Sequence, residues 1–510
     1  MQLRMMIKDY KKNGIEELKN KAVQYNIYKN SVLEYGSSLF FIRKAEMGRE
    51  LIIVKQSDTF DQFRGEIIKT DGIYTKKANL SNENAAVIRD TFKYTQPKSF
   101  GKDETTLGLG DRLGIASPGH IAAIRGTNAK PILAQQSIRE LQLTNRTYQD
   151  VLDDVTWAVF QEGYRGGYGA DGDHLKSAGE VKMALETGFT MITLDCSEYI
   201  NNTINKMTMV EIEKKYKQLP FTKLKELEKY YLNKMFVLNS GEKITFKKDD
   251  LMKTALIYHK MIDFTRGIYQ NQIKKSDRVI DFEISIDETS TPTTPQAHYF
   301  VATELMRLAV DFVSLAPKFI GEFQKGIDYI GDIKQFEQEF KLHSAIADHF
   351  GYKLSIHSGS DKLSIYPVIA RYTNGRVHIK TSGTSWLEAM RVIAKYEPDL
   401  YRKIHIFALR HFKEATKYYH VTTNLDNILD ISKLRDEQLP ELLCQNDARQ
   451  LIHLTYGLIL NDRQQGNYLY KDELYQKWHK YEKEYRIILK RHIGRHLKKL
   501  GIKIELKLSD

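Results

Sequence analysis

The chain has 510 residues, with 77 Lys and Arg against 65 Asp and Glu, which gives a formal net charge of +12. With 42% hydrophobic and 28% charged residues, the sequence can bury a large core, and this excludes a globally disordered chain. Its two cysteines exclude a disulfide scaffold and a four-thiolate zinc site.

Residues 1–100 are interpreted as an N-terminal α/β extension. A helical pattern runs from Ile15 to Tyr28, and Glu50–Lys55 reads as a strand, but this region carries no recognisable chemistry. The first residues lack the apolar run of a secretory signal, and no apolar stretch of the chain is long enough to cross a membrane. We therefore expect a soluble, cytoplasmic protein without a membrane partner, and a homo-oligomer is compatible with this sequence.

Short apolar runs that end in Gly, Asp, His or Lys and are followed by helical patterns begin near residue 105. Such alternation predicts a parallel sheet, and eight units predict a (β/α)8 barrel, a TIM-like α/β fold over residues 101–395. The eight predicted strands are Thr106–Leu109, Pro131–Gln135, Tyr168–His174, Thr190–Asp195, Val279–Ile286, Phe312–Ala316, Lys353–His357 and Val377–Thr381.

The segment between the fourth and fifth strands, from Cys196 to Arg278, is too long for a connecting loop. Its periodic apolar residues predict a helical insertion over about residues 200–275. Residues 396–510 are predicted to form a basic, mainly helical C-terminal region.

Half of the net charge lies at the C-terminal end, where residues 471–510 hold 12 Lys and Arg against 6 Asp and Glu. Tyr481–Leu500 reads as an amphipathic helix with basic residues around its polar face. A solvated face on a docked helix is the simpler interpretation. Nucleic-acid binding is the alternative, which no zinc-finger, RNA-recognition or phosphate-loop motif supports.

Polar side chains gather at the predicted strand ends, where a barrel places its chemistry. The third strand ends GADGDHLK, with Asp173 and His174, and the fifth reads DFEISIDE, in which Glu283 is predicted to face the barrel interior. A buried carboxylate requires a cation, a partner or a proton. Structural, turn-capping carboxylates at these positions are the alternative interpretation.

Other strand ends and the loops after them supply His298, Lys318, His357 and Lys380, and a glycine turn at Gly383 opens a helix that is suited to bind an anion. Imidazoles with carboxylates suit Zn²⁺, Mn²⁺ or Fe²⁺, although the spacing of these histidines matches no compact metal motif. The run LGLGDRLG, residues 107–114, lacks the dinucleotide-binding glycine spacing, and no nucleophile elbow is present.

Five segments together resemble the tagaturonate epimerase family. They are GYGADGDHLK, FEISIDETSTPTTPQAHYFVA, LAPKFIGEFQKGIDYIGD, IHSGSDKLSIYP and KTSGTSWLEAMR, and the resemblance covers roughly residues 105–392. The resemblance implies a metal-dependent isomerase of hexuronate catabolism that converts tagaturonate to fructuronate by inverting C4, on a small anionic sugar acid.

Given that resemblance, we expect metal-assisted retro-aldol and aldol chemistry. We assign a divalent cation (Zn, Mn, Fe, Co or Ni) to His174, His298 and His357, and acid/base roles to Asp173 and Glu283. Arg112, Lys318 and Lys380 are candidates for the substrate carboxylate, with Asp361 and Glu288 as reserve ligands. A metal-dependent barrel aldolase or isomerase on a related sugar acid remains the alternative enzyme.

Overall fold

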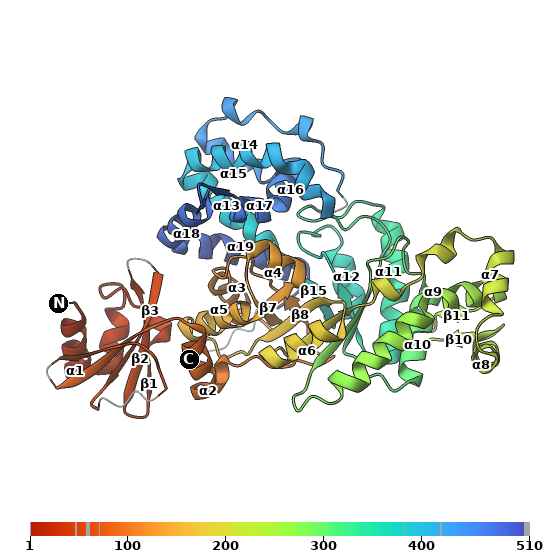
Figure 1. Cartoon of the computed structure of the whole chain (residues 1–510), viewed down its shortest axis with the longest axis horizontal. Coiled ribbons are helices and arrows are strands. Elements are labelled where there is room, and N and C mark those ends of the chain that lie inside the picture. The colour runs from red at the N-terminus through yellow and green to blue at the C-terminus, as the bar shows by residue number, and fades with distance from the viewer. Residues whose placement is uncertain are drawn as a thin grey trace.

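The computed structural model describes residues 2–503 except 46–47, 58–61, 71, 382 and 419–420. Its central barrel carries an N-terminal sheet at one end, an insertion at the other and a C-terminal helical region above (Figure 1). Among the helices so described, none combines the length and the apolar character that crossing a membrane requires.

The N-terminal unit is a five-stranded antiparallel sheet in the order β1-β2-β3-β5-β4, with apolar clusters on both faces. Side chains alternate along β2: Phe41 packs toward helix α1, and Phe40 packs toward α2 and toward the barrel helix α5 (Tyr148–Gln161). The bounds are α1 (Gln2–Asn20), β1 (Leu33–Tyr35), β2 (Ser38–Ala45), β3 (Gly48–Lys55), β4 (Glu66–Thr70), β5 (Ile73–Asn79) and α2 (Asn82–Thr91). Gly14 has non-helical backbone angles and divides α1, so the helix predicted from Ile15 to Tyr28 begins where expected, directly after this break, but ends at Asn20.

Eight parallel strands close into a barrel in the order β12-β13-β14-β15-β6-β7-β8-β9. The predicted (β/α)8 fold is confirmed, and every strand lies within two residues of its predicted ends. The strands are β6 (Thr106–Gly108), β7 (Lys130–Ser137), β8 (Gly169–Leu175), β9 (Met191–Asp195), β12 (Asp281–Ile286), β13 (Ser314–Pro317), β14 (Lys353–Ile356) and β15 (Val377–Lys380).

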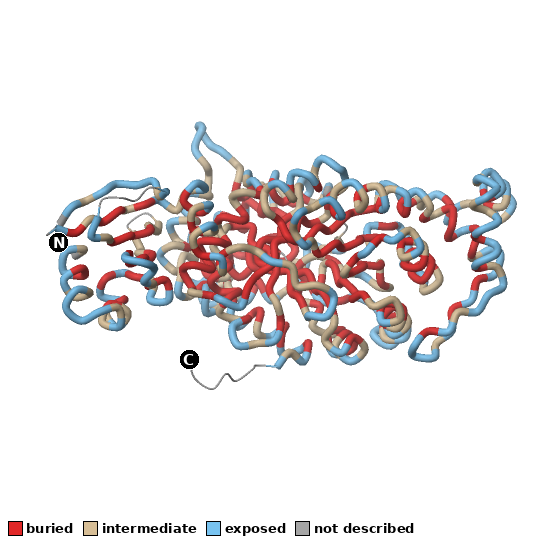
Figure 2. Tube along the Cα trace, turned by 90° about the horizontal axis from the view of Figure 1, so that it is seen from below, coloured by how far each residue is buried: buried red, intermediate tan, exposed pale blue. Residues whose placement is uncertain are grey.

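Helices surround the barrel, whose strands are buried at the centre of the molecule (Figure 2). The helices bury apolar residues against the outward-facing strand residues. Side chains such as Ser177 and Thr147 cap their first turns and satisfy free backbone N–H groups. These helices are α3 (Ser117–Ile124), α4 (Ile138–Thr144), α5 (Tyr148–Gln161), α6 (Ala178–Thr187), α9 (Lys248–Ile268), α10 (Pro295–Arg307), α11 (Ile333–Phe350), α12 (Tyr366–Thr373) and α13 (Thr384–Tyr396).

The insertion between β9 and β12 is mostly helical, as the periodicity predicts. It holds α7 (Met209–Tyr216), α8 (Phe221–Tyr231) and the long helix α9, and it also contains a short hairpin of β10 (Met235–Val237) and β11 (Lys243–Thr245). These three-residue strands are too short to give an alternating pattern in the sequence.

The C-terminal helices form a second apolar core with α13, which contains the buried Trp386 and Trp478. They are α14 (Pro398–Ala415), α15 (Leu439–Leu442), α16 (Asn446–Leu454), α17 (Tyr456–Asn461), α18 (Lys471–Lys480) and α19 (Glu482–Lys499). Helix α19 buries Tyr485, Leu489 and Ile493 against α3 and α13, so the predicted amphipathic helix docks by its apolar face.

Candidate active site

The interior of the barrel is polar and centres on Lys380, the last residue of β15. Its ammonium Nζ lies 2.6 Å from Oδ1 of Asp173, 3.0 Å from Oδ2 of Asp171 and 3.1 Å from Oε1 of Glu283. It also donates a 2.5 Å hydrogen bond to Oγ1 of Thr193. All five residues are buried.

The strand register brings these groups together. Glu283 of β12 pairs with Thr193 of β9 on one side and Ser314 of β13 on the other, so all three side chains share the inner face. The Ser314 hydroxyl donates to Glu283 at 2.6 Å, and the Thr193 hydroxyl donates to Asp171 at 2.9 Å. The predicted inward orientation of Glu283 is therefore correct.

Burial and ion pairing oppose each other in setting the pKa values of this cluster. Burial would lower the pKa of Lys380, but the three carboxylates outweigh it and hold that pKa well above the usual range. Burial would raise the pKa of Asp173 and Glu283, yet Lys380 and neighbouring imidazoles keep both well below their usual values. For Asp171 burial prevails and raises the pKa to about 6.

A second group lies at the mouth of the barrel, where His174, Asp287 and His357 place potential metal-ligand atoms within 4.8 Å of one another. Nδ1 of His357 is 3.0 Å from Oδ1 of Asp287, and Nε2 of His174 is 3.9 Å from the same oxygen. Two imidazoles and one carboxylate form a common ligand set for a divalent transition metal.

The remaining nitrogen of each imidazole faces a carboxylate. Nδ1 of His174 lies 2.7 Å from Oδ1 of Asp173, and Nε2 of His357 lies 2.8 Å from Oε1 of Glu283. Metal-binding histidines typically have their second nitrogen held in this way, which fixes both the tautomer and the ring orientation. The ligand set and its supporting carboxylates are thus both present.

Charge also favours a cation here. Three carboxylates, of Asp171, Asp173 and Glu283, contact Lys380, and a fourth, of Asp287, contacts His357. Such an excess of buried negative charge is costly. His357 responds to it: burial would lower its pKa, but Asp287 and Glu283 prevail and raise that pKa to about 10. A divalent cation would supply the charge that the proton on His357 supplies otherwise.

His298 does not belong to this group, which corrects its assignment as a ligand. It lies in the first turn of α10 and points into the helix layer, with Nδ1 2.9 Å from Nδ1 of His343 and Nε2 2.6 Å from the Tyr352 hydroxyl. Both ring nitrogens therefore have partners within the core. Asp287, one residue beyond β12, takes the position that the sequence interpretation gave to His298.

The reserve ligands also lie elsewhere. Glu288 is exposed and 3.8 Å from Lys176. Asp361 faces the C-terminal helices, where its N–H donates to Nε2 of His496 at 3.1 Å and its carboxylate pairs with Arg449 at 2.5 Å. The loop that follows β14 and starts with His357 is therefore anchored by α16 and α19.

The three cations expected to bind a substrate carboxylate lie in different surroundings. Lys380 is surrounded by protein carboxylates, which does not fit that role, and the ammonium of Lys318 donates to the carbonyl of Thr289. Arg112 is buried, contacts Oε1 of Glu140 at 2.8 Å and stacks on the ring of Tyr456. Of the three, Arg112 lies beside the Gly383 turn that opens α13.

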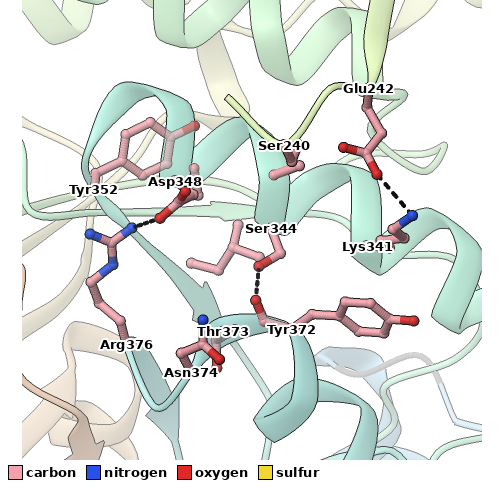
Figure 3. A pocket seen from close by; sticks show the side chains of 13 residues that line it. Ser240, Glu242, Lys341, Ser344, Asp348, Tyr352, Tyr372, Thr373, Asn374 and Arg376 are labelled. Atoms are coloured by element: carbon pink, nitrogen blue, oxygen red, sulfur yellow. Dashed lines mark hydrogen bonds and ion pairs between the residues drawn. The ribbon is translucent and has the colours of Figure 1, made fainter. Parts of the chain in front are cut away.

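A pocket between α11, α12 and the β10–β11 hairpin is a different feature (Figure 3). Its charged side chains neutralise each other, with Glu242 paired to Lys341 at 2.8 Å and Asp348 to Arg376 at 2.5 Å. It opens beside the start of β14, whereas barrel chemistry collects at the opposite strand ends.

Comparisons with known proteins agree with one another. The family described as tagaturonate epimerase matches residues 28–500. A Thermotoga maritima protein named tagaturonate/fructuronate epimerase is 41% identical over 476 residues, which covers 93% of this chain and 96% of that protein. A glycerol-complexed crystal structure of fructuronate-tagaturonate epimerase UxaE from Cohnella laeviribosi is 50% identical with a TM-score of 0.92, covering 96% of this chain and 99% of that one. The native crystal structure of that enzyme is 49% identical with a TM-score of 0.91 and the same coverage.

Proposed function

The chain belongs to the tagaturonate epimerase family and is an isomerase that interconverts tagaturonate and fructuronate at C4, and we propose that it does so by breaking and re-forming the C3–C4 bond. The observation that carries this proposal is the pairing of His174 with Asp173 and of His357 with Glu283 around Asp287.

The substrate's own chemistry favours cleavage over direct proton removal. The C4 hydrogen of a 2-keto-hexuronate is not adjacent to the ketone, so its carbanion would lack stabilisation. The C4 hydroxyl is β to that ketone, so loss of its proton allows C3–C4 cleavage. This gives a C4 aldehyde and an enediolate, which re-form the bond after the aldehyde turns its other face.

His174, Asp287 and His357 are the residues that would hold a divalent cation. When bound there, the cation supplies Lewis-acid polarisation of the C2 carbonyl. Asp173 and Glu283 would orient the two imidazoles, each by a hydrogen bond to the ring nitrogen that faces away from the cation.

Asp173 is the stronger candidate for proton transfer with the C4 hydroxyl. Its pKa lies well below the usual range because Lys380 and His174 outweigh burial, so the carboxylate is ionised at neutral pH and can accept a proton. Glu283 is completely buried, accepts a hydrogen bond from Ser314 and lies 2.8 Å from Nε2 of His357, so it acts through His357. Lys380 stabilises the negative charge of both carboxylates.

We also propose a cytoplasmic location. Both cysteines are free thiols, one buried at Cys196 and one exposed at Cys444, which suits a reducing compartment.

A substrate that carries deuterium at C4 tests the mechanism. Cleavage of C3–C4 never breaks the C4–H bond, so we expect full retention of deuterium in the product and no primary kinetic isotope effect. A primary effect would instead support oxidation at C4 and would overturn the proposal. Metal analysis and turnover after chelation test the cation separately, since activity without any divalent ion would exclude its role.

A further inference from the structure

His453 is a buried imidazole that the mechanism does not use. Helix α16 places its ring between two glycines of the barrel mouth, Gly326 in the loop after β13 and Gly383 at the start of α13. A Cβ atom at Gly383 would lie 2.7 Å from Cε1 of His453 and 2.9 Å from Nη2 of Arg112. Glycine at this position, with φ of +95°, therefore leaves room for both side chains.

The ring of His453 lacks partners for its polar atoms. His453 is 1% exposed, and neither Nδ1 nor Nε2 has a hydrogen bond within the part of the chain that the structure describes. A buried polar group without a partner costs free energy, so such a group at a barrel mouth points to a ligand.

The charge around the ring indicates the kind of ligand. Burial and the nearby cations Arg112, Lys325 and Arg449 lower the pKa of His453 well below its usual value, so the ring is neutral and donates one N–H. Glu140 and Asp361 compensate the two arginines, whereas Lys325 forms no ion pair among the described residues. The N-terminus of the 13-residue helix α13 adds partial positive charge.

We propose that His453 binds the C6 carboxylate of the hexuronate, together with Lys325 and the N-terminus of α13. This inference rests on the proposed function, because it requires the reaction centre at the adjoining strand ends. Gly383 is three residues after Lys380, a span of at most about 10 Å, and the C6 carboxylate lies beyond C4 from the ketone.

The proposal gives the carboxylate a part in the reaction. After C3–C4 cleavage, C6 belongs to the aldehyde fragment, which must stay bound while C4 presents its other face. Contacts to C6 hold this fragment without restricting rotation at C4. The C-terminal region would thereby supply substrate recognition to a barrel that supplies the chemistry.

The test compares His453→Ala with His405→Ala. His405 of α14 is also buried and also lacks partners for both ring nitrogens among the described residues, but it lies in the C-terminal core. We expect His453→Ala to raise KM for tagaturonate roughly 10- to 100-fold, the range for a lost hydrogen bond to a charged group. KM for the neutral ketose that carries a hydroxymethyl group at C6 should not change. His405→Ala should leave both values unchanged.

His453→Gln keeps an N–H donor and should recover part of the affinity, and it replaces the alanine variant if that variant does not fold. An unchanged KM for tagaturonate in His453→Ala, or an equal rise for the neutral ketose, would overturn the proposal. Failure of the proposed mechanism would show differently, as a C4 isotope effect or metal-independent turnover in the unmodified enzyme.

Discussion

The ammonium of Lys380 on β15 lies 2.6 Å from the carboxylate of Asp173 on β8, across the barrel, although the two residues are 207 positions apart in the chain. This pair joins the charge cluster inside the barrel to the mouth, because Asp173 also contacts His174. The stability of the barrel and the state of the site are therefore linked through one lysine.

Replacing Lys380 with Met should cost about 3–5 kcal/mol of unfolding free energy at pH 8, since it leaves three buried carboxylates without their cation. The loss should shrink as the pH falls toward 5, because the unpaired carboxylates then take up protons in the folded state. Urea unfolding at several pH values measures this, and wild-type stability at pH 8 would contradict it.

Asp287→Ala should weaken divalent metal binding by more than the roughly 10- to 100-fold that loss of an outer-shell partner costs, because it removes a proposed ligand. Titration calorimetry with Zn²⁺ and Mn²⁺ on metal-free protein gives the affinities. His298→Gln is the matched control, since both of its ring nitrogens have partners in the core, and it should keep wild-type affinity. Wild-type affinity in Asp287→Ala together with weakened binding in His298→Gln would instead identify His298 as a ligand.

Asp173→Asn should lower kcat about 10²- to 10⁴-fold while the fold is retained, because the amide cannot accept the proton of the C4 hydroxyl. Asp281→Asn serves as the control, since that carboxylate lies at the other end of the barrel and accepts hydrogen bonds from the N–H groups of Phe100 and Gly101. Turnover is followed by NMR of tagaturonate and fructuronate. Near-normal turnover by Asp173→Asn would exclude Asp173 as the essential group.

His405→Leu should stabilise the protein in acid. Burial lowers the pKa of His405 from 6.5 to about 4, so the unfolded chain binds the proton more tightly and wild-type stability falls as the pH drops below 6.5. The free energy of unfolding of the variant minus that of the wild type should therefore be about 2 kcal/mol larger at pH 5 than at pH 8. Thermal or urea unfolding measures both values. If the stability difference between variant and wild type were the same at the two pH values, the pKa of His405 would not be lowered in the folded protein.

The sequence predicts the barrel well because its strands have a local signature. Each is a short apolar run that ends in a polar cluster, and the inner position of Glu283 follows from alternation alone. The hairpin of β10 and β11 lacks such a signature, as each strand has three residues held mainly by its neighbours.

The site is only partly predictable, because a residue belongs to it only if its side chain points toward the other site residues as well as lying near a strand end. His174 and His357 stand at strand ends, and the structure brings them together with Asp287. His298 lies in the first turn of a helix, where one further residue turns a side chain by about 100°, so proximity in sequence did not fix its orientation. A signal for Asp287 was present in the alternation of DFEISIDE, since Asp287 continues the inward series of Glu283 and Ser285.

The contact between His496 and the backbone of Asp361 has a consequence for synthesis of the chain. The residues that hold the His357 loop belong to α16 and α19, whereas the last barrel strand ends at Lys380. During translation, a ribosome-bound chain can close its barrel before α16 and α19 have emerged. Such a nascent barrel would contain the cluster around Lys380 but would lack the contacts of α16 and α19 with the His357 loop, so activity would begin only after α19 has emerged and docked.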